Sequence, residues 1–189
     1  MSKAVSALMG ATFQGFCAVE EAGLVGMITL RGDLKADTLA KALKGAVGCA
    51  VPAPRRVDVG KKGTAAWMSP DELLLIVDYD GAQAIEQTLS KALASTHAMV
   101  VNVSDARAVF QVKGSGARDV IAKLSPADVS PTAFGPGEMR RTRLAQVAGA
   151  FHMLDEETFQ IVCFRSVADY VFGLLTDASK PGAEVGHLG

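Results

Sequence analysis

The sequence predicts an α+β protein built from two ferredoxin-like split β-α-β modules related by an internal repeat. Three observations lead to this prediction: a globular composition, strand and helix patterns that recur in the same order in both halves, and an apolar hairpin in each half. The chain has 189 residues, of which 49% are hydrophobic and 21% charged. We expect antiparallel sheets with the helices on one face of each.

A strand that ends in glycine, followed by a helix, opens each half. Residues 27–32 read as the first strand, and apolar residues recur at helical spacing from Asp33 to Gly45. Residues 109–114 repeat the strand and its glycine 82 positions later. Residues 115–124 repeat the helix, which Ser115 is expected to cap.

A β-hairpin follows in each half. Residues 65–77 contain two apolar strands around the polar turn Ser69-Pro-Asp-Glu72, in which proline and aspartate favour turn geometry. Residues 150–162 repeat the pattern around Asp155-Glu-Glu157, and Ile161 lies 85 positions after Ile76. We attribute the three-residue drift from 82 to a difference in turn length.

A second helix follows each hairpin, at 81–95 and at 166–178, where Ser166 is placed to act as an N-cap. After the first of these helices, residues 99–103 read as a strand. The first half is therefore β-α-β-β-α-β and the second β-α-β-β-α.

The segments that do not repeat are loops and ends. Proline-rich stretches at 51–63 and 125–138 are expected to be surface loops that bind or dock something. We expect the two modules to form one compact domain. The expected boundaries are an N-terminal extension at 1–24, the first module at 25–103, the second at 104–178 and a flexible tail at 179–189.

Charge and cysteine usage limit the classes of partner. Nineteen Lys and Arg against 20 Asp and Glu make nucleic acid an unexpected partner. No apolar run is long enough to span a membrane, and no export signal is evident. Cys17, Cys49 and Cys163 are widely separated and suit reduced, buried thiols, so a cytoplasmic protein is expected.

Individual candidates for chemistry each have a simpler structural interpretation. His97, His152 and His187 lack the spacing of metal ligands, and His152, a conceivable general base in a strand, has no neighbouring nucleophile. The segment Lys113-Gly-Ser-Gly-Ala-Arg118 follows a strand and opens a helix, where an anion can bind. It lacks a complete phosphate-binding motif, and the repeat favours turn chemistry instead.

The charged clusters also have simple structural interpretations. We therefore predict no catalytic, cofactor-binding or metal-ligating residue in this chain. Two clusters of acids lie at hairpin turns, where carboxylates are usually solvated, and Arg141 and Arg143 share one face of a strand, facing solvent or a partner. This inventory indicates binding or assembly rather than catalysis. The clusters are Arg140, Arg141 and Arg143, helped by Arg55, Arg56, Lys61 and Lys62, and the acids Asp71, Glu72, Asp155, Glu156 and Glu157.

A series of short motifs resembles the gamma subunit family of heterotetrameric sarcosine oxidase. They occur in the family's order and cover roughly residues 25 to 178. The motifs are Leu30-Arg-Gly-Asp33, Trp67-Met-Ser-Pro-Asp-Glu-Leu-Leu-Leu75, Val103-Ser-Asp105, Val112-Lys-Gly-Ser-Gly-Ala-Arg-Asp119, Arg141-Thr-Arg-Leu-Ala145 and Phe164-Arg-Ser-Val-Ala-Asp-Tyr170.

That family is similar in turn to the folate-binding domain of the glycine-cleavage aminomethyltransferase, which implies the same ferredoxin-like modules. In the aminomethyltransferases a Gly-Gly-x-x-x-Asp-Asp segment at the second hairpin supplies an acid for the folate-linked reaction. Residues 147–152 occupy this place and contain no acid. No catalytic residue carries over.

The resemblance implies a complex that demethylates sarcosine oxidatively to glycine, with hydrogen peroxide and a one-carbon product. FAD, FMN, NAD, zinc and tetrahydrofolate are then expected in the other subunits, and alpha, beta and delta subunits as partners. This chain would be a noncatalytic subunit that packs against alpha, with weak self-association when isolated. A folate-binding protein and a free-standing small-molecule-binding module are the alternatives.

Overall fold

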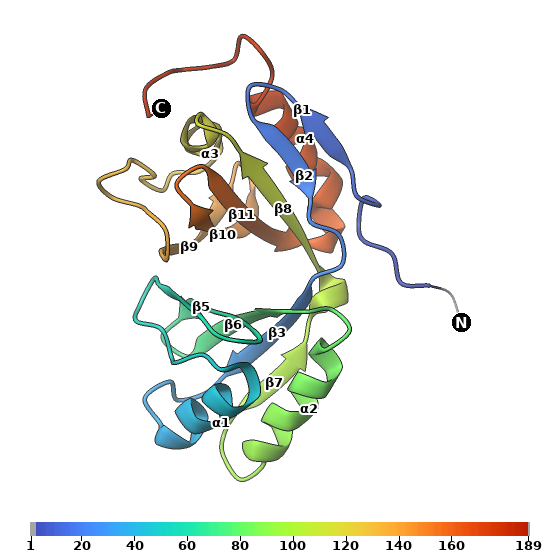
Figure 1. The fold of residues 1–189 in the computed structure, drawn as a ribbon, viewed down its shortest axis with the longest axis vertical. Helices are drawn as coiled ribbons and strands as arrows, with labels where there is room; N and C mark the ends of the chain where they lie inside the picture. The colour runs from blue at the N-terminus through green and yellow to red at the C-terminus, as the bar shows by residue number, and fades with distance from the viewer. Residues whose placement is uncertain (1–2, 189) are drawn as a thin grey trace. The chain divides into compact units, whose positions relative to one another are not determined.

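The computed structural model describes residues 3–188, and the chain divides into two compact units. Leu24–Ser104 form one unit, which we call the inserted unit. Met1–Gly23 and Asp105–Gly189 together form the other, which we call the outer unit. Each unit is an α+β layer of antiparallel strands and helices (Figure 1), so the predicted fold class is confirmed.

The inserted unit is a five-stranded antiparallel sheet in the order β4-β5-β6-β3-β7, with two helices. Its elements are β3 (Gly26–Arg31), α1 (Asp37–Val47), β4 (Val57–Val59), β5 (Gly63–Ser69), β6 (Glu72–Val77), α2 (Ala82–Ala92) and β7 (Met99–Asn102). The expected loop at 51–63 thus contains a short edge strand, β4, which pairs with β5.

Alternation along β3 and β6 sends one set of side chains toward the helices. Ile28 and Leu30 of β3 and Leu75 of β6 pack with Leu43 of α1 and Leu89 of α2, and all five are fully buried. Each such side chain contributes about 1.5–3 kcal/mol on burial, so this cluster stabilises the unit more than any helix propensity does.

The outer unit is a six-stranded antiparallel sheet in the order β1-β2-β8-β11-β10-β9. Its core contains four fully buried phenylalanines. Phe134, Phe151 and Phe159 have ring centroids 5.5 to 5.9 Å apart; Phe134 stacks on Phe159, and Phe151 meets both rings edge to face. Its elements are β1 (Thr12–Gln14), β2 (Ala18–Glu21), β8 (Arg107–Lys113), α3 (Ala117–Leu124), β9 (Met139–Leu144), β10 (Val147–Asp155), β11 (Thr158–Phe164), η2 (Arg165–Val167) and α4 (Ala168–Ala178). A 3₁₀ turn, η1 (Ser104–Ala106), spans the boundary between the two units.

The internal repeat holds strand by strand. In sheet order, β9, β10, β11, β8 and β2 take the places of β4, β5, β6, β3 and β7. Both hairpins have a two-residue turn, Pro70-Asp71 and Glu156-Glu157, preceded by a bulge at the same point of the first strand.

The hairpin alignment from sequence was wrong by one residue, and a difference in turn length does not cause the drift, because both turns have two residues. Leu75 pairs with Ile28, and Ile161 pairs with Phe110, which lies 82 positions after Ile28. Ile161 therefore corresponds to Leu75 and not to Ile76. In a sheet this step decides which face a side chain occupies, because side chains alternate with a period of two.

The N-terminal segment supplies the strand that the second half of the sequence lacks. β2 pairs antiparallel with β8 in the position that β7 holds beside β3. β1 then pairs antiparallel with β2 on its outer side. The segment expected as an extension at 1–24 therefore contributes two strands, β1 and β2, to the outer sheet.

Two expected helix caps are wrong. α3 begins at Ala117 after the N-cap Gly116, and α4 begins at Ala168 after the turn η2, with no side-chain cap hydrogen bond at either. Ser115 and Ser166 lie one residue or more outside the N-cap positions, where their hydroxyls do not reach the first turn. In the described part of the chain, no helix has the length and apolarity needed to cross a membrane.

Candidate functional site

The histidines lie in three separate environments. His152 is buried in β10, and burial lowers the pKa of its imidazole to about 4. Its Nδ1 makes no hydrogen bond to any described residue. His97 and His187 are exposed, in the loop before β7 and in the C-terminal tail. At neutral pH His152 is an uncharged core side chain, which agrees with its structural interpretation.

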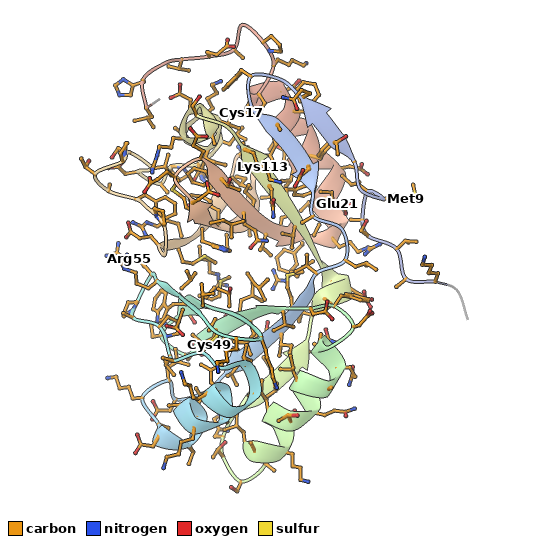
Figure 2. All side chains as sticks on the ribbon, in the orientation of Figure 1. Met9, Cys17, Glu21, Cys49, Arg55 and Lys113 are labelled. Atoms are coloured by element: carbon orange, nitrogen blue, oxygen red, sulfur yellow. The ribbon has the colours of Figure 1, made fainter. Side chains whose placement is uncertain are left out.

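The three cysteines are free and buried. Burial raises the pKa of the Cys17 and Cys163 thiols to about 11 and also raises the pKa of Cys49. Figure 2 labels Cys17 in the outer unit and Cys49 in the inserted unit. A thiolate is the reactive form, so these side chains are held in their unreactive state near neutral pH.

The glycine-rich turn before α3 is filled by the chain itself. A Cβ on Gly116 would lie 2.7 Å from the ring of Phe16, so the missing side chain makes room for that ring. Lys113 at the head of the turn forms an ion pair with Glu20. The turn is therefore packed closely against Phe16.

Arg118 and Asp119 at the start of α3 bind backbone groups of this chain. Arg118 Nη1 donates to the carbonyl oxygens of Val129 and Phe134 at 2.8 and 2.7 Å. Asp119 accepts hydrogen bonds from the backbone N–H groups of Gly186 and Leu188 at 2.7 and 3.0 Å. The motif thus anchors the loop at 125–138 and the C-terminal tail, which sequence alone had suggested to be loosely held.

The arginine strand β9 is an edge strand with two kinds of arginine. Arg140 is half-buried, stacks on the Phe134 ring at 4.8 Å and donates to the carbonyl oxygen of Ala133. Arg141 and Arg143 are both exposed on one face, as the alternation predicted. The remaining basic residues of the predicted cluster, Arg55, Arg56, Lys61 and Lys62, are exposed residues of the inserted unit.

The sequence did not reveal an open cavity of about 600 Å³ at one end of the inserted sheet. Its walls come from the end of β3, the β5-β6 turn and the loop before β7. The lining residues are Arg31, Gly32, Asp33, Pro70, Asp71, His97, Ala98 and Met99.

An arginine between two carboxylates dominates this cavity. Arg31 Nη2 lies 3.1 Å from Asp71 Oδ2, and Arg31 Nε lies 3.8 Å from Glu72 Oε2. The Ser69 hydroxyl, and after it the Arg31 guanidinium, hold the pKa of the Asp71 carboxyl below its usual value. Because its charge is already neutralised, Arg31 is a poor receptor for a further carboxylate.

Residues from two motifs that are far apart in the sequence meet at this cavity. Arg31 belongs to Leu30-Arg-Gly-Asp33, and Asp71 and Glu72 belong to the hairpin turn. The β3-β6 pairing places Arg31 directly opposite Glu72. This contact follows from the register of the β3-β6 pair, which short sequence motifs do not reveal.

Within the described residues, no group of three or more His, Cys, Asp or Glu side chains has the geometry to hold a metal ion. Two acids of the second hairpin turn make local contacts: Asp155 accepts a hydrogen bond from the Glu157 N–H, and Glu156 pairs with Arg118 at 3.2 Å.

Comparison with known proteins identifies similar chains over most of this length. Residues 31–181 match the model of the sarcosine oxidase, gamma subunit family. The sarcosine oxidase subunits gamma of Corynebacterium sp. strains U-96 and P-1 are each 32% identical over 139 residues. The match covers 72% of this chain and 67% and 68% of those two relatives.

Solved structures agree with the sequence comparison. A heterotetrameric sarcosine oxidase from Corynebacterium sp. U-96, in complex with pyrrole 2-carboxylate, matches with a TM-score of 0.80 and 27% identity, over 92% of this chain and 88% of that one. The glycine cleavage system aminomethyltransferase T from Bartonella henselae matches with a TM-score of 0.63 and 14% identity, over 85% of this chain and 45% of that one, and shows the fold alone. The resemblance drawn from short motifs is thus confirmed, and the chain belongs to the sarcosine oxidase gamma subunit family.

Proposed function

We propose that this chain is a noncatalytic subunit of a sarcosine oxidase complex and that it serves assembly or stabilisation by packing against the alpha subunit. The observation that carries the proposal is the match, over 92% of the chain, to a chain of a heterotetrameric sarcosine oxidase. The beta and delta subunits complete the proposed assembly. In it, sarcosine is demethylated oxidatively to glycine, with hydrogen peroxide and a one-carbon product.

The state of the reactive side chains supports a role without chemistry of its own. Cys17 and Cys163 are buried thiols with raised pKa values, and His152 is a buried, uncharged imidazole. None of the three is in the form that attacks a substrate or exchanges a proton near neutral pH. We accordingly assign FAD, FMN, NAD, zinc and tetrahydrofolate to the other subunits. Free thiols also suit a cytoplasmic complex.

Exposed large side chains on each unit supply contact area for partners. In the inserted unit, Met99 and Val101 of β7 are 43% and 41% exposed. In the outer unit, Phe164 and Tyr170 are 46% and 44% exposed. Aromatic and methionine side chains of this kind are enriched where proteins meet, and arginines such as Arg141 often accompany them.

Co-expression of this chain with the alpha, beta and delta subunits tests the proposal. A tag on this chain should retain all three partners through affinity purification and gel filtration, and flavin absorbance should follow the same peak. Oxidase activity should require the flavin-bearing subunits. The proposal is overturned if the chain elutes alone and colourless, or if the purified chain oxidises sarcosine unaided.

Folate binding receives no separate support from these observations. The likeness to aminomethyltransferase T is a likeness of fold at 14% identity. The stretch that would supply the acid, residues 147–152, lies within β10, where Phe151 and His152 are buried.

A further inference from the structure

The strand β7 leaves one edge of the inserted sheet open. It is the last strand in the order β4-β5-β6-β3-β7 and pairs only with β3 among the described strands. Figure 1 shows it at the margin of its sheet, beside α2. An open edge presents backbone donors and acceptors that another strand can pair with.

The pairing pattern shows which backbone groups face outward. The N–H of Val103 donates to the carbonyl oxygen of Met27, one step beyond the β3-β7 ladder. In an antiparallel pair, bonded positions alternate, so Val101 and Met99 also bond toward β3. The N–H and C=O groups of Val100 and Asn102 therefore point to the open side.

The outer unit shows the same edge with a strand in place. β2 corresponds to β7 residue by residue, because Val19 faces Val112 of β8 as Val100 faces Leu30 of β3. On its other side β2 pairs with β1, with Phe13 opposite Val19. The N–H of Glu21, which corresponds to Asn102, donates outward to the carbonyl oxygen of Ala11.

A hollow lies beside the open edge in the inserted unit. It has a volume of about 350 Å³. Its lining comes from the end of α2, the connection that follows it and the start of β7: Ser90, Leu93, Ala94, Thr96, Ala98, Met99 and Val100. In the outer unit the side chain of Phe13 packs against the core on this side of the sheet. The turn between β1 and β2 there bonds to the end of α4, since the N–H of Phe16 donates to the carbonyl oxygen of Ser179.

We propose that an extended segment of another subunit of the sarcosine oxidase complex adds to β7 as an antiparallel sixth strand, in the place that β1 takes beside β2. The segment bonds to the backbone of Val100 and Asn102 and places a large apolar side chain opposite Val100, where it fills the hollow beside α2. Met99 and Val101, exposed on the opposite face, pack on its neighbouring side chains. This inference rests on the proposed function, because it needs a partner subunit to supply the strand.

A proline substitution tests the edge directly. Val100→Pro removes an outward N–H and leaves the bonds to β3 intact, so the inserted sheet should still form. Val59→Pro is the matched control: Val59 lies on β4, at the opposite edge of the same sheet, and is 76% exposed. The N–H of Trp67 donates to the carbonyl oxygen of Arg56, and the N–H of Gly60 donates to that of Gly63. Arg56 and Gly60 therefore bond toward β5, and because bonded positions alternate, the N–H of Val59 points outward.

A second variant tests the hollow without touching the strand. Ala94 is an exposed residue just after α2, so Ala94→Trp can fill the hollow at little cost to folding. The assay is binding of each full-length variant to the co-expressed partner subunits, with the thermal midpoint of the isolated chain as a folding check. Val100→Pro and Ala94→Trp should each weaken binding at least about tenfold, and Val59→Pro should not.

Hydrogen exchange adds a residue-level readout. In the complex, the amides of Val100 and Asn102 should exchange at least about tenfold more slowly than in the isolated chain, and the amide of Val59 should not change. If Val100→Pro and Ala94→Trp both bind the partner subunits as well as the wild-type chain does, strand addition is overturned and the proposed function stands. Strand addition is also overturned if Val100→Pro converts a dimer of the isolated chain into a monomer, since the edge then serves a second copy. If the wild-type chain does not bind the partner subunits at all, the proposed function fails, and strand addition with it.

Discussion

Replacing Arg118 with alanine should destabilise the outer unit by about 3–5 kcal/mol. The Arg118 side chain is 7% exposed and donates to two carbonyl oxygens, at 2.8 Å to Val129 and 2.7 Å to Phe134. A hydrogen bond to a charged group contributes about 1.5–3 kcal/mol, and alanine leaves both acceptors without their donor. The ion pair with Glu156, whose side chain is 75% exposed, adds at most about 1 kcal/mol.

The assay for this change is urea unfolding followed by far-ultraviolet circular dichroism, with amide exchange across the loop at 125–138. Arg118→Ala should lower the free energy of unfolding and speed exchange in the loop. Glu156→Ala, which removes only the exposed ion pair, should stay within about 1 kcal/mol of the wild type. If Arg118→Ala also stays within that range and loop exchange is unchanged, Arg118 does not anchor the loop and the reasoning is refuted.

Three further predictions concern buried polar groups. Glu21→Ala removes the acceptor for Ser6, Leu8 and Gly10 and should cost about 2–3 kcal/mol and expose the N-terminal segment to limited proteolysis. The folded pKa of His152, about 4, lies below the usual histidine pKa of 6.5, so the unfolded chain binds the proton first as pH falls. Stability should then drop by up to about 3 kcal/mol between about pH 6.5 and 4, and His152→Phe should remove this loss while His97→Ala keeps it. At pH 8 a disulfide reagent should label the native Cys17 and Cys163 thiols about a hundredfold more slowly than thiols in urea, and equal rates would contradict their raised pKa values.

The repeat and the fold class were predictable because both modules carry the same local signals. Glycine after the first strand, a polar two-residue turn and amphipathic helices are short-range features that a sequence displays directly. They were enough to place β3, β6, β8 and β11 and the helices near their true positions. The one-residue error at Ile161 arose because neighbouring apolar residues fit either register equally well in sequence.

Features that depend on pairing between distant segments could not be predicted from the sequence. β1 has three residues, and β2 precedes the module that it completes, so a search for the repeat downstream did not find them. The contact between Arg31 and Asp71 joins residues 40 positions apart and follows from sheet register. The serine caps failed because a glycine or a 3₁₀ turn intervenes before each helix begins.

The split of the outer unit around the inserted unit sets an order of events during synthesis. Glu20 of β2 finds its partner Lys113 on β8 only after 93 further positions have been made. The inserted unit lies wholly within that interval, so all of its residues are added to the chain before those of β8. Early in its life, the chain therefore carries β1 and β2 as an unpaired hairpin whose own sheet does not yet exist. Isolated hairpins are only marginally stable in water, so β1 and β2 stay marginally stable until the rest of the outer sheet and α4 have been synthesised.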